Sequence, residues 1–416
     1  MTTMVNLEES VAQLAGIVGG EHVRMAGGVV HISPADTQQI AEVLRYANEN
    51  HLAVMPVGGG TKLRWGNPVE AAIHLSLGRM NAVREHAWQD MTCTVPAGCT
   101  WAAMQSALAQ HGQMVALDPV WQQRATVGGI VAANDNGALR LKYGGLRDLI
   151  IGMTIVLADG TIAKTGGKVV KNVAGYDLHK LMTGSFGTLG VIAEINFRLH
   201  PKERTCRTWE LHSEQSEVLH GILLRLLDSQ LALDAVQLCG EGQNYRLHLR
   251  SSSCIAETVV ETENELRSLA EGLELRPAEE DIWQTREKLF SHQDAVIIKA
   301  TMLPTQIAAA LTMLQNWSSR ASQSCHSVTQ ANGIMTAALS GSHFSIVLLI
   351  EKLRAHLKPT GGAVTIVQLP VIFNPHLDVP LNLWGSTSDA LPLMREIKRR
   401  FDPNRILNPG RFVGGI

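Results

Sequence analysis

A glycine-rich turn, GSFGTLG at residues 184–190, leads directly into an apolar run that begins at Val191. A basic stretch interrupted by glycine, KVVKNVAGYDLHK, precedes this turn from Lys168. Glycine accepts backbone conformations and close approaches that a side chain forbids, so the pattern favours a tight loop joined to a strand. A bound dinucleotide is the kind of ligand that this spacing suggests.

A second glycine loop, PVGGGTK at residues 56–62, follows the expected strand Leu52–Val57. Three consecutive glycines remove every Cβ that would block close approach of the backbone to a phosphate. Before the strand, SPAD at residues 33–36 predicts a helix with Ser33 as its N-cap and proline in its first position. We therefore expect a unit made of a helix, a strand and a phosphate-binding loop.

The two glycine loops do not match the common nucleotide motifs. A Walker A loop requires GxxxxGK followed by Ser or Thr, which GGGTKL lacks, and GSFGTLG has the spacing GxxGxxG rather than the Rossmann GxGxxG. The net charge of −2 gives no electrostatic footprint for nucleic acid or an anionic membrane. Kinase, ATPase, classical NAD-binding and nucleic-acid-binding functions are therefore disfavoured.

The length of 416 residues favours two domains, and 45% hydrophobic residues are ordinary for a globular protein. No uncharged stretch approaches the roughly 20 residues that span a bilayer, and the acidic N-terminus lacks an apolar signal region, so we expect a cytoplasmic protein. The 6 cysteines are scattered without CxxC spacing, and the 16 histidines form no HExxH motif. We predict reduced structural thiols and no metal.

Further elements follow from local patterns. Thr100 is expected to cap a helix with a buried stripe of Trp101, Met104 and Leu108. The segment TVGGIVAANDNG at 126–137 suits a chain that threads against a flat apolar ring, in a region where strands dominate and Asp159-Gly160 marks a hairpin. Beyond about residue 206, long amphipathic stretches separated by short strands predict an α+β domain.

Taken together, the glycine-rich segments resemble the FAD-binding domain of the vanillyl-alcohol oxidase family, the PCMH type. Members pair a PxGGGT-like pyrophosphate loop, a GG-x-x-A-x-N flavin segment and a GSxGTLG turn, which correspond here to Pro56–Thr61, Gly128–Asn134 and Gly184–Gly190. KNVAGYDL at 171–178 and FDPNRILNPGRF at 401–412 look like the FAD-binding subunits of bacterial glycolate oxidases (glycolate dehydrogenases).

The resemblance implies an α+β fold in two domains. A PCMH-type FAD-binding domain of two α/β subdomains is expected over residues 25–205. An α+β substrate or cap domain with an antiparallel sheet is expected over 206–416, with a tail from about 384 that returns toward the FAD domain. Residues 206–375 carry no matching motif, so the substrate domain rests on the resemblance alone.

The resemblance also implies non-covalent FAD, because relatives that tether the flavin usually carry a histidine in the first glycine loop, where Lys62 follows Thr61 here. The loop amides would bind the diphosphate, and the small residues of the second segment would lie against the isoalloxazine. The predicted cofactor-binding residues are Pro56, Gly58, Gly59, Gly60, Thr61, Lys62, Asp118, Pro119, Thr126, Val127, Gly128, Gly129, Ala132, Asn134, Asp148, Lys171, Gly187, Gly190, Val191 and Ile192.

Three of the charged candidates keep alternatives. Lys168 and Lys171 would neutralise the diphosphate or the reduced flavin, or else belong to a solvated basic hairpin. Asp148 follows the flavin strand in the family pattern, or else simply caps a turn. Arg411 is hypothesised to anchor the tail to a phosphate or an acid.

The function implied is an FAD-dependent oxidoreductase: a subunit of a glycolate-type 2-hydroxy-acid oxidase or dehydrogenase whose flavin accepts a hydride and passes electrons onward. A second flavin subunit and an iron–sulfur subunit are the expected partners. One alternative is a flavin-binding relay or assembly subunit without substrate chemistry, and another is a stand-alone oxidase of another alcohol or hydroxy acid. No catalytic residue is assigned, because single histidines without visible partners are interpreted as structural: His326, His343, His356 and His376.

Overall fold

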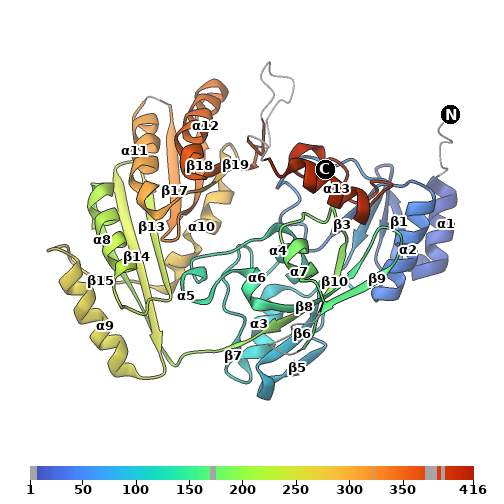
Figure 1. Ribbon diagram of the computed structural model, residues 1–416, viewed down its shortest axis with the longest axis horizontal. Coiled ribbons are helices and arrows are strands. Elements are labelled where there is room, and N and C mark those ends of the chain that lie inside the picture. Colours follow the sequence, from blue (N-terminus) through green and yellow to red (C-terminus); the bar gives the residue numbers. More distant parts are fainter. Residues whose placement is uncertain (1–6, 169–174, 321, 371–381, 386–388) are drawn as a thin grey trace. The chain divides into compact units, whose positions relative to one another are not determined.

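A computed structural model describes residues 7–168, 175–320, 322–370, 382–385 and 389–416. The chain packs as two compact units (Figure 1). The first unit comprises Met1–Asp135, Gly145–Lys202 and Thr387–Ile416, and the second comprises Asn136–Gly144 and Glu203–Ser386. The segment that ends the sequence therefore belongs in space to the first unit.

The first sheet of the first unit has the strand order β1-β2-β4-β3. Its strands are Val23–Ala26 (β1), Val29–Ile32 (β2), Val54–Val57 (β3) and Ile73–Ser76 (β4). β4 runs parallel to both β2 and β3, while β1 is antiparallel to β2. The helices α1 (Leu7–Val18) and α2 (Thr37–Glu49) supply buried side chains to the same core as this sheet.

The second sheet of this unit is antiparallel, in the order β5-β6-β10-β8-β9. Its strands are Glu85–Ala87 (β5), Thr92–Pro96 (β6), Ile150–Val156 (β8), Ile162–Gly166 (β9) and Val191–Arg198 (β10). A short ribbon pairs β7 (Gln113–Met114) with β11 (His200–Pro201). The helices of this part are α3 (Trp101–Ala109), α4 (Val127–Ala133), α6 (Leu146–Leu149), α7 (Leu178–Met182) and α13 (Leu391–Phe401).

The second unit is built on an eight-stranded antiparallel sheet in the order β15-β12-β14-β13-β17-β18-β16-β19. Its strands are Thr205–Ser213 (β12), Ala235–Glu241 (β13), Asn244–Ser253 (β14), Arg276–Pro277 (β15), Val296–Thr301 (β16), Ser324–Gln330 (β17), Ile334–Ser340 (β18) and Ala363–Gln368 (β19). Its helices are α5 (Arg140–Tyr143), α8 (Ser216–Asp228), α9 (Ala256–Leu269), α10 (Thr285–Lys288), α11 (Ile307–Ser318) and α12 (His343–Leu357).

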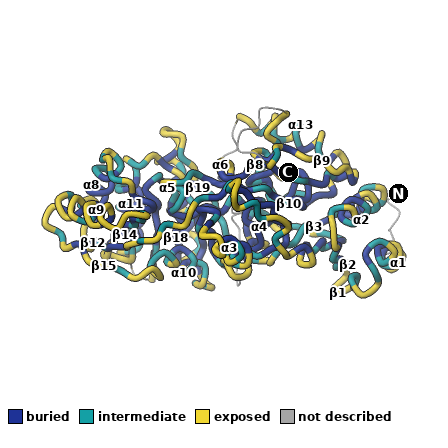
Figure 2. The backbone as a smooth tube through the Cα atoms, turned by 90° about the horizontal axis from the view of Figure 1, so that it is seen from below, coloured by how far each residue is buried: buried dark blue, intermediate teal, exposed yellow. Residues whose placement is uncertain are grey.

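Each unit has its own hydrophobic core. Side chains from α8, α9, α11 and α12 join those of the eight-stranded sheet, whereas the core of the first unit collects both of its sheets with α2, α3 and α4. Figure 2 shows β8 and β10 as largely buried and the outer side of α9 as largely exposed. Buried strands beside helices that expose one face are typical of sheets covered by amphipathic helices.

The predicted α+β fold with an antiparallel sheet in its second half is confirmed, and so is the hairpin at Asp159-Gly160. Residues 127–133, for which no helix was predicted, form the helix α4, because Thr126 caps its first turn and the apolar run is buried on several sides. One local expectation is wrong. The cap of α2 is Asp36 rather than Ser33, since the Asp36 carboxylate accepts from the Gln39 N–H at 2.9 Å.

Candidate functional site

The first glycine loop begins where β3 ends and packs directly against the residues before α4. A Cβ on Gly59 would lie 1.8 Å from the carbonyl oxygen of Arg124, and one on Gly58 would lie 2.0 Å from the Thr126 hydroxyl oxygen. Real Cβ atoms do not approach so closely, so no larger residue fits either position without moving the backbone. These two glycines thus let the loop pack on the neighbouring segment. This packing requires glycine here independently of any approach to a phosphate.

The backbone of this loop keeps its donors available. The N–H groups of Gly58, Gly59, Gly60 and Thr61 have no acceptor within the part of the chain that the structure describes. Gly60 has a φ of +71°, so the loop turns through the left-handed region. Consecutive N–H groups in such a turn form a concave site for an anion.

The helix α4 carries the second glycine segment to the same place. Thr126 caps α4, with its hydroxyl accepting from the Gly129 N–H at 3.4 Å. A Cβ on Gly128 would lie 2.6 Å from the Cβ of Ala97, which fixes α4 tightly against β6. Asn134 ends the helix with a φ of +49°, a conformation that asparagine tolerates better than most residues.

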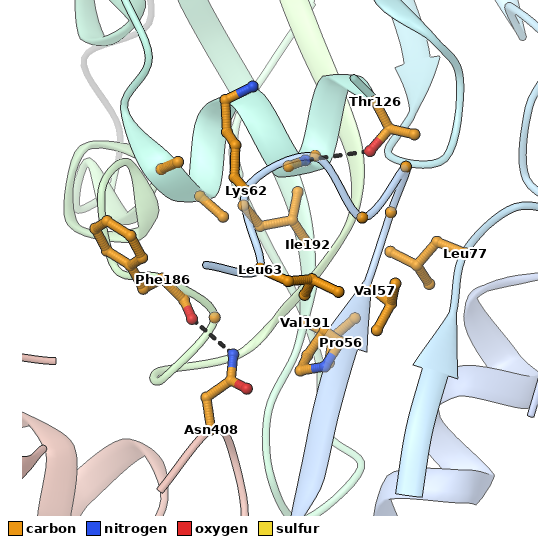
Figure 3. Close-up of a pocket in the computed structure, with 18 of the residues that line it drawn as sticks. Pro56, Val57, Lys62, Leu63, Leu77, Thr126, Phe186, Val191, Ile192 and Asn408 are labelled. Carbon is orange, nitrogen blue, oxygen red and sulfur yellow. Dashed lines mark hydrogen bonds between the residues drawn. The ribbon is translucent and has the colours of Figure 1, made fainter. Parts of the chain in front are cut away.

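The GSFGTLG turn closes another side of the site with help from the C-terminal tail. Phe186 and Gly187 both have positive φ, of +53° and +68°. The side-chain amide of Asn408 donates to the Phe186 carbonyl at 2.7 Å (Figure 3). The Oδ1 atom of Asn408 is buried and has no donor among the described residues. It remains available to a hydroxyl or amino group of a ligand in the pocket.

Arg411 holds the end of the glycine loop. Its Nη2 atom donates to the carbonyls of Lys62, Leu63 and Trp65 at 3.0, 3.0 and 3.1 Å. Burial lowers the pKa of its guanidinium to about 10. Arg411 also lines the pocket, and its contact with a phosphate or an acid stays a prediction.

Lys62 lies buried beside the loop in a charged and aromatic environment. Its Nζ is 3.2 Å from the Asp135 carboxylate, and the two side chains are only 7% and 1% exposed. The rings of Trp65 and Trp121 have their centroids 5.4 and 5.3 Å from the same ammonium group. Figure 3 shows the Lys62 side chain directed away from Pro56 and Val57. A buried ion pair between aromatic rings fixes this lysine in one position.

These elements surround one open pocket in the first unit. The cavity itself measures about 90 Å³, and the empty space among its lining residues, open solvent included, is about 720 Å³. Because sites for drug-sized ligands usually span about 300–1,000 Å³, the cavity can seat only part of a dinucleotide. The predicted residues that line it are Pro56, Gly58, Gly59, Gly60, Thr61, Lys62, Thr126, Gly128, Gly129, Ala132, Gly187, Gly190, Val191 and Ile192.

The remaining predicted residues are not among those that line this pocket. Val127 is fully buried in the core, and the Asp148 carboxylate accepts from the Gly145 N–H at 2.8 Å, as a turn cap does. Asp118, Pro119 and Asn134 also lie outside the lining. Lys171 falls outside the described residues, and their assignment to FAD stays a prediction.

The structure adds lining residues that the glycine motifs did not indicate: Val57, Leu63, Leu77, Ala133, Phe186, Asn408 and Arg411. Leu77 arrives from the loop after β4, and Asn408 arrives from the tail. Neither carries a local signal, because each is brought to the pocket by packing between distant segments. Phe186, in contrast, stands inside the recognised turn and a closer reading of that motif includes it.

Comparisons with known proteins agree with this geometry. Residues 29–166 match the family described as "FAD binding domain", and residues 384–412 match "FAD linked oxidases, C-terminal domain". The glycolate oxidase subunit GlcD of Bacillus subtilis (strain 168) is 39% identical over 178 residues, 42% of this chain and 38% of that protein. The D-lactate dehydrogenase of Archaeoglobus fulgidus is 37% identical over 182 residues, 44% of this chain and 41% of that protein.

These matches span about two fifths of the length of the two relatives. Among solved structures, p-cresol methylhydroxylase with substrate bound superposes with a TM-score of 0.73 at 15% identity, over 99% of this chain and 97% of that one. At this identity the likeness establishes the fold. The predictions of a PCMH-type fold and of FAD as the cofactor are confirmed.

The residues of the pocket fit FAD on two observations of their own. The available N–H groups of the glycine loop suit the diphosphate, and the buried Oδ1 of Asn408 awaits a donor. Within the described ranges, no group of three His, Cys, Asp or Glu side chains is arranged to hold a metal ion. None of the described helices is long and apolar enough to cross a bilayer.

Proposed function

We propose that this chain, whose residues 29–166 match an FAD binding domain, is an FAD-dependent oxidoreductase subunit acting on a small 2-hydroxy acid of the glycolate or D-lactate type. Bound FAD supplies a two-electron acceptor for the hydride of the substrate carbon. The observation that carries the proposal is the meeting of the predicted glycine segments around one pocket, inside the region that matches an FAD binding domain.

The residues of this chain bind and orient the cofactor. The amides of Gly58, Gly59 and Gly60 hold the diphosphate, while Thr61 adds a hydroxyl donor. The tail contributes Asn408, whose Oδ1 accepts from the nucleotide. Lys62 places a fixed positive charge beside the loop, balanced by Asp135.

The substrate and the partners belong to the same proposal. Both relatives named above carry a hydroxy acid in their names, and one of them is named as a subunit. We therefore propose that electrons leave through a complex containing a second flavin subunit and an iron–sulfur subunit. The cytoplasm is the proposed location of this assembly.

An anaerobic visible spectrum of the purified chain tests the proposal. The blue absorbance of oxidised flavin is followed before and after addition of glycolate or D-lactate. Rapid bleaching is the expected result and places hydride transfer on this chain. An intact flavin spectrum that neither acid bleaches would favour a relay or assembly subunit, and a spectrum without flavin would refute FAD binding.

A matched pair of glycine variants makes the test specific. Gly59→Val places its Cβ on the Arg124 carbonyl, so flavin content and bleaching should both fall to the background level. Gly16→Ala, in α1, meets no atom within 4 Å and should keep both. Full flavin content in Gly59→Val would contradict the role assigned to the loop.

A further inference from the structure

A second pocket lies within the second unit and is made of different residues from the glycine loops. Its cavity measures about 280 Å³, small beside the roughly 300–1,000 Å³ of sites for drug-sized ligands. Its lining includes Cys239, Arg246, His248, Lys288, His292 and His326. A thiol, imidazoles and cationic side chains therefore meet in a space that admits a small molecule.

Three neighbouring strands bring a thiol, an imidazole and a carboxylate into line. Glu210 of β12 is the cross-strand partner of His248 of β14, so both side chains lie on one face of the sheet. Cys239 of β13 stands two residues from Gln237, the other cross-strand partner of His248, and thus shares that face. The Cys239 Sγ is 3.7 Å from His248 Nδ1, and His248 Nε2 is 3.2 Å from Glu210 Oε2.

The hydrogen bonds assign the proton positions on His248. Glu210 accepts from Nε2, so that nitrogen carries the proton. The Gln237 amide nitrogen donates to the Ile282 carbonyl at 3.3 Å and lies 3.2 Å from Nδ1. In the neutral ring Nδ1 is therefore an acceptor, and it faces both the Gln237 amide and the Cys239 thiol. This is the order of groups found where a base activates a nucleophile and an acid orients the base.

The charges around His248 strengthen it as a base. Burial alone would lower the pKa of His248, but Cys239 and Glu210 raise it to about 9. The other cysteines of the core differ, because burial raises the pKa of Cys93 and of Cys325 to about 12 and neither has such a partner among the described contacts. Cys239 is thus distinguished by a neighbouring base and by its opening on a pocket.

We propose that Cys239, His248 and Glu210 form a second reactive site, in which the Cys239 sulfur attacks small carbon electrophiles that enter the pocket. The step uses the neutral form of His248, whose share grows as pH rises toward 9, and the thiol proton passes to its Nδ1 as the S–C bond forms. With an alkyl halide the carbon–halogen bond breaks and halide leaves. With a carbonyl compound the C=O π pair moves to oxygen, which takes the proton back from His248, so the adduct is reversible.

The remaining charged and titratable groups around the pocket are Arg246, Glu241, Lys288, His292 and His326. Arg246 also lies 3.9 Å from the Glu210 carboxylate, and His326 lies 3.7 Å from Glu241. Glu210 acts through His248 and is a positioning residue, so its substitution should change the pH dependence of the reaction rather than abolish the thiol.

Iodoacetamide is the probe, applied to the full chain carrying Cys206→Ser and Cys254→Ser to remove the two exposed thiols. Alkylation of the peptide containing Cys239 is followed by mass spectrometry from pH 6 to 9. General-base assistance predicts that His248→Gln slows the reaction on the order of tenfold or more near pH 9, where the neutral ring is populated. Glu210→Gln, which keeps a similar shape at a partly exposed position, removes a charge that raises the pKa of His248 and should move the midpoint of the pH–rate profile downward.

Three results would overturn the proposal in whole or in part. Equal alkylation rates in the parent and in His248→Gln, with both chains showing the same thermal unfolding, would leave His248 no role as a base. Failure of iodoacetamide to reach Cys239 in the folded parent, while Cys254 reacts in the wild-type chain, would show that the pocket does not admit electrophiles. An unchanged pH–rate profile in Glu210→Gln would remove Glu210 from the site. None of these readouts depends on bound flavin, so they are independent of the function proposed above.

Discussion

Single residues at the flavin pocket are held by contacts that leave little freedom. Gly58 and Gly59 press the loop on the segment before α4, and Arg411 fastens the end of the same loop through three carbonyls. The free N–H groups are therefore fixed before a ligand arrives. Such preorganisation lowers the entropy that binding must overcome.

The buried pair Lys62–Asp135 gives a prediction at this scale. Lys62→Met leaves the Asp135 carboxylate buried without its cation, and this should lower the free energy of unfolding of the first unit by about 3–5 kcal/mol. Lys62→Met combined with Asp135→Asn removes both charges and should recover most of the loss. Urea denaturation of the two variants checks this. A double variant no more stable than Lys62→Met would contradict the charge argument.

At the scale of elements, the helices α3 and α4 both begin with a threonine N-cap but lie at different distances from the pocket of the glycine loops. Thr100 caps α3 and Thr126 caps α4, each through its side-chain oxygen. Thr126 lines the pocket of the glycine loops, whereas Thr100 does not. Substituting each threonine in turn therefore distinguishes an effect on helix stability from an effect on cofactor binding.

Thr126→Ala and Thr100→Ala should each cost about 1 kcal/mol of stability, since each removes one capping acceptor. Only Thr126→Ala should also weaken FAD binding, because it loosens the contact between α4 and Gly58. Titration of the flavin-free chain with FAD measures this, alongside thermal unfolding. Equal FAD affinities in the two variants would show that the cap of α4 is not part of the site.

The strands around His248 give a pH-dependent prediction. Its pKa is about 9 in the folded chain against 6.5 as an ordinary value, despite the opposing effect of burial. Between these pH values the folded state holds a proton that the unfolded state releases, so stability is present below pH 6.5 and is lost as pH rises through 9. The loss is up to about 3 kcal/mol for this shift.

Unfolding of the second unit by urea at pH 6 and pH 9 checks the sign. His248→Gln should flatten the difference between the two values, because it removes the titrating group. Cys239→Ser should reduce the difference in part, since Cys239 contributes to raising this pKa. A wild-type chain that grows more stable toward pH 9 would contradict the assignment.

Local patterns predicted the elements that depend on neighbours in sequence. The capped helix α3, the strand before the first glycine loop and the hairpin β8–β9 all carry their signals within a few residues. The helix α4 was not predicted because its GG-x-x-A composition disfavours a helix, and its burial by distant strands outweighs that propensity. Asn408 and Leu77 could not be predicted, since only the folded chain brings them beside the loop.

For the whole molecule, the sequence indicated two domains but not how the chain is shared between them. Residues 136–144 pack in the second unit and the last thirty or so in the first. Inside α13 and the segment after it, buried Lys398 donates to the Asp402 carboxylate at 2.6 Å and to the Thr188 carbonyl at 2.7 Å. The tail is thereby fixed on the GSFGTLG turn, a contact between positions far apart in sequence.

Two separate cores predict two thermal transitions, and the pocket lies in the first unit alone. FAD should therefore raise the transition of the first unit, by about 2.7 kcal/mol of stabilisation at a ligand concentration of 100 Kd, while the second changes less. Calorimetry of the flavin-free chain with and without FAD measures both. Gly59→Val should lose the shift, and Gly16→Ala should keep it. A shift confined to the transition that Cys239→Ser alters would place the main FAD contacts in the second unit, contrary to the assignment made from the glycine loops.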